Sequence, residues 1–181
     1  TKDALIESYT IHCAAEAAQL DRLIVHLSQA RPQPISWSIV GEQDRALAVR
    51  KLSQAEQIAA GVGAGGEAWK ITLRRRRAVP LQLRGSRISS LETEQPIALA
   101  SLPEAAEQSG RLTIRASRSA PCEVHNRRLK PIPAKITPPG QFSTARAVYR
   151  YQPAREALAA ADPAIVVKRA PQNQQQPGAW A

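Results

Sequence analysis

The sequence predicts an all-β fold, an antiparallel β-sandwich of the jelly-roll type with one to three short helices. Three observations support this. Apolar residues alternate with a period of two along much of the 181-residue chain, proline and glycine clusters separate the alternating segments at short intervals, and no amphipathic segment of 10–15 residues lies between them. A closed barrel fits the proline-rich connections less well.

The first third of the chain predicts half-buried strands at 5–13, 20–27 and 35–40. In the first of them, Tyr9, Ile11 and Cys13 share one face. A turn is expected at 31–34, because its two prolines cannot donate ladder hydrogen bonds. A weaker strand is expected around 46–51, and the Ser53–Glu56 capping-box pattern predicts a short helix after it.

The period-two pattern is clearest at 69–88. Trp69, Ile71 and Leu73 share one parity, which Leu81 and Leu83 continue. The segment is either two consecutive strands or one strand bent near 78–80, because Pro80 favours an edge position or a break.

The second half predicts strands at 111–118, 145–151 and 165–169 and an apolar run at 97–102, which a turn or short helix follows. The five prolines within 121–139 favour a meandering edge or loop, and 153–161 is a candidate helical turn. We predict one sandwich domain over 1–170, and a Gln/Pro linker with the start of a following segment over 171–181. Because the chain has no methionine, we expect it to be part of a larger protein.

The net charge of +10 suggests an anionic partner, and seven arginines fall on polar-side strand positions. If their strands are neighbours, they form one basic face that could bind an anionic polysaccharide or cell-wall polymer. The set is Arg74, Arg76, Arg84, Arg111, Arg115, Arg146 and Arg150. The same face could instead be solvated or carry an acidic neighbouring domain. The arginine run at 74–77 by itself favours a charged strand end that discourages edge pairing.

Several partner classes are disfavoured. Aromatic residues are not interleaved with the arginines and no nucleic-acid-binding motif occurs, so we expect no sequence-specific nucleic-acid partner. No run of about 18 apolar residues and no signal peptide is present, so we expect no membrane insertion by this fragment.

The sequence predicts no catalytic, cofactor-binding or metal-binding residues. Gly61–Gly66 matches a dinucleotide-binding pattern, but the expected order is helix, glycines, strand, the reverse of what that site requires. No GxSxG elbow occurs, and no histidine has metal-ligand spacing. His12 and His26 are expected at the surface, and Glu104 and Glu107 read as solvated charges.

The two cysteines and two of the tryptophans each allow two interpretations. Cys13 and Cys122 could form a disulfide worth roughly 4–5 kcal/mol, or could be two separate buried thiols. Trp37 and Trp69 could stack on sugar rings, but both share parity with isoleucine and leucine neighbours, which favours a place in the core.

A resemblance adds to this interpretation. The segments Trp69–Leu73, Pro96–Glu104, Gly110–Ile114 and Ala147–Pro153 resemble β-sandwich modules of large membrane-anchored bacterial surface proteins of unassigned activity. The resemblance covers about 67–169. It implies an extracytoplasmic location, in the periplasm or at the cell surface, with other domains of the parent chain as partners, and it supplies no functional residues.

We therefore expect a non-catalytic structural or interaction module of a secreted or surface protein. The alternative is a module that binds carbohydrate or another anionic polymer through its basic strand face. An enzyme fragment whose site is completed by missing domains has the least support.

Overall fold

The structure, a computed structural model, describes residues 4–14, 19–41, 47–62, 65–78, 80–117, 121–133, 143–153 and 162–170. Nearly all regular elements in these ranges are strands. They are β1 (Ala4–Cys13), β2 (Gln19–Leu27), β3 (Ser36–Ile39), β4 (Leu47–Lys51), α1 (Gln54–Ala59), β5 (Glu67–Ala78), β6 (Leu81–Ser90), β7 (Glu94–Pro96), β8 (Ala100–Ser101), β9 (Gly110–Ser117), β10 (Cys122–Asn126), β11 (Lys130–Pro131), β12 (Ser143–Tyr151) and β13 (Ile165–Arg169).

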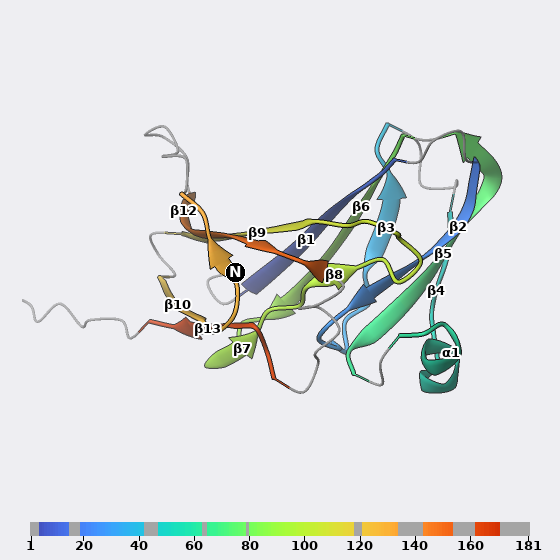
Figure 1. The fold of residues 1–181 in the computed structure, drawn as a ribbon. Helices are drawn as coiled ribbons and strands as arrows, with labels where there is room; N and C mark the ends of the chain where they lie inside the picture. The colour runs from blue at the N-terminus through green and yellow to red at the C-terminus, as the bar shows by residue number, and fades with distance from the viewer. Residues whose placement is uncertain are drawn as a thin grey trace, which may run out of the picture.

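The strands form four small sheets, and the strand pairs within them are antiparallel. Sheet 1 has the order β1-β6-β3, sheet 2 β4-β5-β2-β8, sheet 3 β10-β13-β7 and sheet 4 β11-β12-β9. Sheets 1 and 2 face each other at the right of Figure 1, and β10, β12 and β13 lie at the left. The predicted all-β, sandwich-like class is confirmed.

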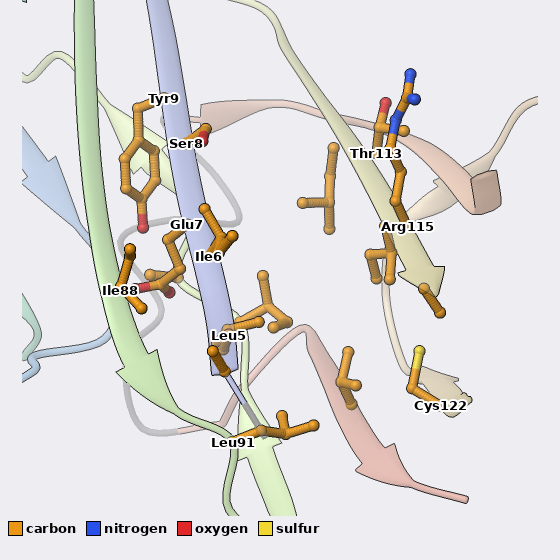
Figure 2. Close-up of a pocket in the computed structure, with 17 residues that line it drawn as sticks. Leu5, Ile6, Glu7, Ser8, Tyr9, Ile88, Leu91, Thr113, Arg115 and Cys122 are labelled. Carbon is orange, nitrogen blue, oxygen red and sulfur yellow. The ribbon is translucent and has the colours of Figure 1, made fainter. Parts of the chain in front are cut away.

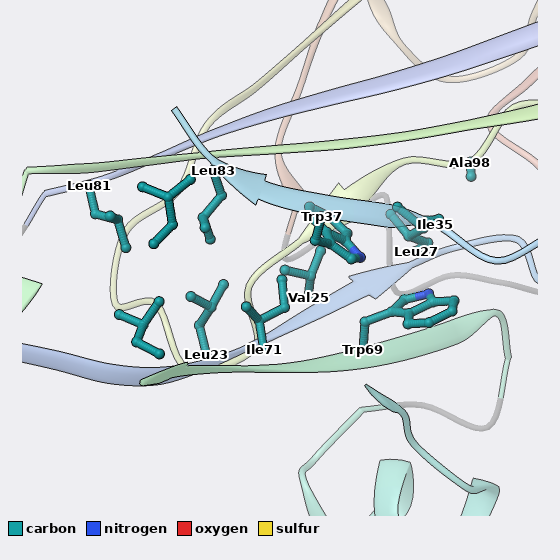
Figure 3. Close-up of a cluster of buried hydrophobic side chains, with 12 residues drawn as sticks. Leu23, Val25, Leu27, Ile35, Trp37, Trp69, Ile71, Leu81, Leu83 and Ala98 are labelled. Carbon is teal, nitrogen blue, oxygen red and sulfur yellow. The ribbon is translucent and has the colours of Figure 1, made fainter. Parts of the chain in front are cut away.

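The first core fills the space between sheets 1 and 2, as Figure 3 shows. Its buried members are Leu23, Val25, Leu27, Ile35, Trp37, Ile39, Trp69, Ile71, Leu73, Leu81, Leu83 and Ala98. Trp37 of β3 lies opposite Gly85 of β6, where an added Cβ would come within 2.6 Å of the indole. Only glycine therefore leaves room for this ring in the core.

A second core lies beside the first. Ile97, Leu99, Ile114, Leu129, Tyr149, Tyr151, Ala164, Ile165 and Val167 form its buried part. The segment 97–99 connects sheets 3 and 2 and contributes to both cores: Ala98 joins the first, whereas Ile97 and Leu99 join the second. One domain over 1–170 stays a prediction, and within it the chain packs around two cores that share this segment.

The 69–88 region forms two strands, β5 and β6, as one of the two sequence interpretations had it. They do not pair with each other, because β5 belongs to sheet 2 and β6 to sheet 1. Their common parity is explained by this arrangement, since Ile71 and Leu83 enter the same core from opposite sheets.

Elsewhere the structure refines the sequence reading. The proline-rich 121–139 stretch, expected to be a meandering edge or loop, contains two short strands, β10 and β11, and both lie at the edges of their sheets. The apolar run at 97–102 is an extended connection between β7 and β8. The helical turn at 153–161 and the linker at 171–181 fall almost wholly outside the described residues.

Helix α1 begins with the predicted capping box. The Glu56 backbone donates to Ser53 Oγ, and the Glu56 carboxylate accepts from the Ser53 backbone. The hydrogen bond from Arg50 and those from Ser53 lower the pKa of Glu56 to about 2. The carboxylate is therefore charged over the neutral range, as the N-terminus of a helix favours.

Candidate functional site

The predicted arginine face is divided among three sheets. Arg74 and Arg76 lie on β5 in sheet 2, Arg84 lies on β6 in sheet 1, and Arg111, Arg115 and Arg150 lie on β9 and β12 in sheet 4. These six side chains are exposed. Arg146 belongs to β12, but its side chain lies outside the described residues. The structure thus brings together only the arginines of sheet 4.

The arginine run of β5 lies beside an irregularity of strand pairing. The register of β2 against β5 moves from Leu20 opposite Arg77 to Arg22 opposite Thr72. Arg74 and Arg76 therefore sit where β5 has no residue-for-residue partner on β2. Because β5 lies between β4 and β2 in sheet 2, the interpretation of this run as a charged strand end that discourages edge pairing stays a prediction.

Sheet 4 carries a row of three cations across its strands. Lys130 of β11 lies opposite Arg150 of β12, which lies opposite Arg111 of β9. All three side chains are exposed, and within the described ranges none forms an ion pair with an acidic residue. Like charges directly opposite each other destabilise a sheet, so a bound anion would relieve the repulsion within this row.

A buried ionic network crosses the first core. The Arg87 guanidinium on β6 contacts the Glu7 carboxylate, which belongs to its cross-strand neighbour on β1, and the Glu67 carboxylate on β5 of the opposite sheet. All three side chains are buried. The network therefore joins sheet 1 to sheet 2 through charge in an otherwise apolar interior.

Two further cations extend this network, Lys51, whose side chain is 44% exposed, and Arg31, whose side chain is 11% exposed. Lys51 Nζ lies 2.7 Å from Glu67 Oε2, and Arg31 Nε lies 4.0 Å from Glu7 Oε1. Arg31 also donates to the Pro96 carbonyl, which links the loop after β2 to β7. With three cations for two carboxylates, each buried carboxylate is compensated, as burial of charge requires.

Tyr9 completes this polar cluster. Its ring stacks on Trp37 with centroids 6.3 Å apart, and Figure 2 shows its hydroxyl on the same side of β1 as the Glu7 carboxylate. Burial, and secondly the charge of Glu7, raise the pKa of Tyr9 well above its ordinary value. The phenol is therefore neutral and unsuited to act as a base.

The prediction that His26 lies at the surface is wrong. The residue is 0% exposed because the Gly65 turn and Ser101 of β8 cover its side of the sheet. His26 Nε2 donates to the Gly65 carbonyl at 2.9 Å, so Nδ1 accepts from Ser101 Oγ at 3.3 Å. Burial lowers the pKa of His26.

The Ser101–His26 contact has the pattern of a nucleophile and its base. Both residues are buried, however, and the ring is fully satisfied by Ser101 and the Gly65 carbonyl. A hydrogen-bonded core histidine that holds β8 and the Gly65 turn on β2 accounts for this geometry without chemistry.

We expect this histidine to make stability pH-dependent. Its pKa in the fold lies below its ordinary value of 6.5, so below about pH 6.5 the unfolded chain takes up a proton that the fold excludes. The free energy of unfolding should then fall as the pH decreases from 6.5 towards the folded pKa. Urea unfolding between about pH 5 and pH 8 checks this. The difference in free energy of unfolding between the wild type and His26→Gln should become smaller as the pH falls. An equal difference at the two ends of this pH range would contradict the assignment.

The two cysteines pack against different cores, whereas the two described tryptophans both lie in the first. Cys13 packs against the first core and Cys122 against the second, and no disulfide joins these two described residues. This favours the interpretation as separate thiols. Trp37 and Trp69 are buried in the first core, as their parity predicted, and Trp180 lies outside the described residues.

The glycine run occupies the context that the sequence predicted. Helix α1 precedes it and β5 follows it, so the strand-before-helix order of a dinucleotide site is reversed. Gly61 and Gly66, at the two ends of the run, adopt positive φ, a conformation typical of turn glycines. Across the described ranges, no three His, Cys, Asp or Glu side chains gather as a metal site would require. No helix within those ranges is long and apolar enough to cross a membrane.

Two cavities follow β1 along its whole length, and we call them together the seam groove. The first, about 550 Å³, is lined by residues 4–9 of β1 and residues 112–116 of β9. The second, about 650 Å³, is lined by residues 10–12 and 14 on one side and by Gly110 and Arg111 on the other. Figure 2 shows β1 between β6 and β9, with β9 across the first cavity.

Exposed apolar side chains mark the rim of the seam groove. Ile6 is 66% exposed and Ile88 is 64% exposed, and the two are cross-strand partners on β1 and β6. Both line the first cavity, whose floor includes Leu5, Ile97 and Val167. A paired apolar patch beside a cavity is typical of a contact surface rather than of a solvated sheet.

The ionic network was not predicted, although the sequence places charged residues on the apolar faces of two strands. Glu7 shares the parity of Tyr9 and Ile11, and Arg87 that of Leu81 and Leu83. A charged residue on the apolar face of a strand must find a partner inside, so opposite charges at these positions predict an internal pair. The seam groove gave no such signal, because it depends on how β1 and β9 meet.

No protein-family model, curated protein or solved structure matches the chain.

Proposed function

We propose that this chain is a non-catalytic interaction module that binds another protein at the seam groove. The observation that carries the proposal is the exposed Ile6–Ile88 pair on the rim of the first cavity. The cavities fall in the range of about 300–1,000 Å³ that is common for ligand sites. Placement in an extracytoplasmic surface protein belongs to the same proposal and rests on the sequence resemblance.

The chemistry of the described side chains supports the non-catalytic part. The buried charges of Glu7, Glu67 and Arg87 are engaged with one another, and both ring nitrogens of His26 are hydrogen-bonded. Hydrolysis of an activated ester should therefore proceed at the same rate with wild type and Ser101→Ala. A rate that Ser101→Ala abolishes would make the Ser101–His26 contact catalytic and overturn this part.

Peptide display tests the interaction part. Peptides selected on the whole chain should bind the wild type and Ile58→Lys equally, and Ile88→Lys at least about tenfold more weakly. Ile58 of α1 is a matched control, because it is an isoleucine of 60% exposure that does not line the groove. Selection of no binding peptide, or equal binding by Ile88→Lys, would contradict the proposal.

A second candidate function is binding of an anionic polymer, and the cation row of sheet 4 favours it. Lys130, Arg150 and Arg111 lie side by side without acidic partners in the described residues. Heparin should then bind the wild type in physiological salt, and Arg150→Thr should lose this binding while Arg74→Thr keeps it. Complete loss of wild-type retention near physiological salt would leave only weak charge attraction.

A further inference from the structure

The two longest edge strands of the described residues border the same groove. Each of the four sheets has two edge strands, and β1 and β9 have ten and eight residues. The other six, β3, β4, β7, β8, β10 and β11, have two to five residues each. Among the described residues β1 pairs only with β6 and β9 only with β12, so each has one open edge.

The open edge of β1 lacks the features that usually block strand addition. Its sequence contains neither proline nor lysine, and its ten-residue register with β6 runs without a bulge. Natural proteins protect edges with prolines, inward charges, bulges or very short strands. β1 does carry an inward charge, Glu7, but the Arg87 contact neutralises it and leaves the backbone of the edge regular.

We propose that the seam groove receives an extended segment of a partner protein as an added β-strand. The segment pairs its backbone with β1 on one side and β9 on the other, and so joins sheets 1 and 4 into one continuous sheet. This inference rests on the proposed function and specifies its binding mode. Main-chain hydrogen bonds supply the affinity, and side chains of alternate residues supply the selectivity.

The walls of the groove define the chemistry of this segment. Its inward side chains meet the apolar floor, which includes Leu5, Ile97 and Ile114. Its outward side chains lie beside Arg111 and Arg115 of β9, exposed cations without acidic partners among the described residues. Glu107, at the far end, is the opposing exposed acid.

The fitting partner is therefore a strand in which apolar residues alternate with aspartate or glutamate. A capped decapeptide of alternating valine and glutamate should bind the whole chain saturably and at least about tenfold more tightly than its valine–lysine counterpart. Binding should slow hydrogen exchange at amides of β1 and β9. The same peptide N-methylated at every second residue should bind at least about tenfold more weakly, because one of its two edges then lacks backbone donors and can no longer pair.

Charge reversal on the groove wall gives the matched test. Arg115→Glu should abolish or invert the preference for the glutamate peptide, whereas Arg74→Glu, an exposed arginine outside the groove, should leave it unchanged. Equal binding of both peptides, unchanged binding after N-methylation, or exchange protection outside β1 and β9 would overturn the inference. Dimerisation of the chain through β1 would overturn it too, because a second copy would then be the occupant.

These outcomes separate the inference from the proposed function. If display-selected peptides bind in an Ile88-dependent manner but are not acidic strands, the interaction module stands and strand addition fails. If no selected peptide depends on Ile88, the proposed function itself fails.

Discussion

Replacing Arg87 with methionine should destabilise the protein by roughly 3–5 kcal/mol. The substitution retains most of the side-chain volume but leaves the carboxylates of Glu7 and Glu67 buried without their common partner. An uncompensated charge in a low-dielectric interior costs far more than the pair contributed when intact. Urea unfolding of the variant and the wild type at neutral pH measures the difference.

Removing the whole network should have a much smaller effect. The triple variant Glu7→Leu, Arg87→Met, Glu67→Leu replaces the buried charges with apolar side chains, so its free energy of unfolding should equal or exceed that of the wild type by up to about 4 kcal/mol. Lys51 and Arg31 then lose their carboxylate partners. Lys51 remains hydrated, because its side chain is partly exposed, and Arg31 keeps its hydrogen bond to the Pro96 carbonyl. A triple variant as unstable as Arg87→Met would show that geometry rather than charge balance causes the loss.

The neighbouring arginine of the same strand is the control. Arg84 lies three residues before Arg87 on β6 but is exposed, so Arg84→Met should change stability by no more than about 0.5 kcal/mol. Equal effects of the two substitutions would show that Arg87 is not buried as described.

Replacing Gly66 with alanine should destabilise the protein by roughly 2–5 kcal/mol. Two costs add at this position. Gly66 has a φ of +78°, where a side chain is strained, and an added Cβ would lie 2.1 Å from the Leu27 carbonyl oxygen. Because backbone atoms of β2 cannot rotate away as a side chain does, the turn between α1 and β5 would have to move. Thermal and urea unfolding measure the loss.

The substitution Gly61→Ala distinguishes the conformational strain from the steric clash. The φ of Gly61, +70°, is similar, but an added Cβ would have nothing within 4 Å. Gly61→Ala should therefore cost only the conformational strain, about 1–2 kcal/mol, and Gly66→Ala should exceed it by about 1–3 kcal/mol. Equal stability of the two variants would contradict the close approach of Gly66 to β2.

The ionic network contacts the inner face of β1, whereas the seam groove lies along the edge that does not pair with β6. Glu7 and Tyr9 hold the inner face of the strand against Arg87 and Trp37, and β6 pairs with one of its edges. The other edge faces the groove. A strand held rigidly on one side is a better template for an added strand, because less conformational freedom is lost on binding.

Parity along the strands predicted much of the fold. The alternation of Trp69, Ile71 and Leu73, and of Leu81 and Leu83, placed these residues in the core, where they lie. Local patterns were equally informative at Ser53 and Glu56, since a capping box needs only residues three apart. Such features depend on near neighbours, so a single sequence is sufficient to find them.

Parity failed where both faces of a strand are covered. His26 alternates with Val25 and Leu27 and was therefore placed at the surface, yet the Gly65 turn and Ser101 bury it. The 121–139 stretch was expected to be an edge or loop, and β10 and β11 do lie at sheet edges. Their pairing with β13 and β12, which makes them strands, had no signal in the sequence.

The sequence by itself determined that the chain is all-β, which residues face the first core and where its one described helix begins, because periodicity and capping are local properties. Only the tertiary structure decided which strands are neighbours. That choice divided the seven predicted arginines among three sheets, set Arg87 between two glutamates, and left the edges of β1 and β9 facing one groove. Such contacts join residues far apart in the chain, and their formation depends on how whole sheets pack rather than on the residues beside them.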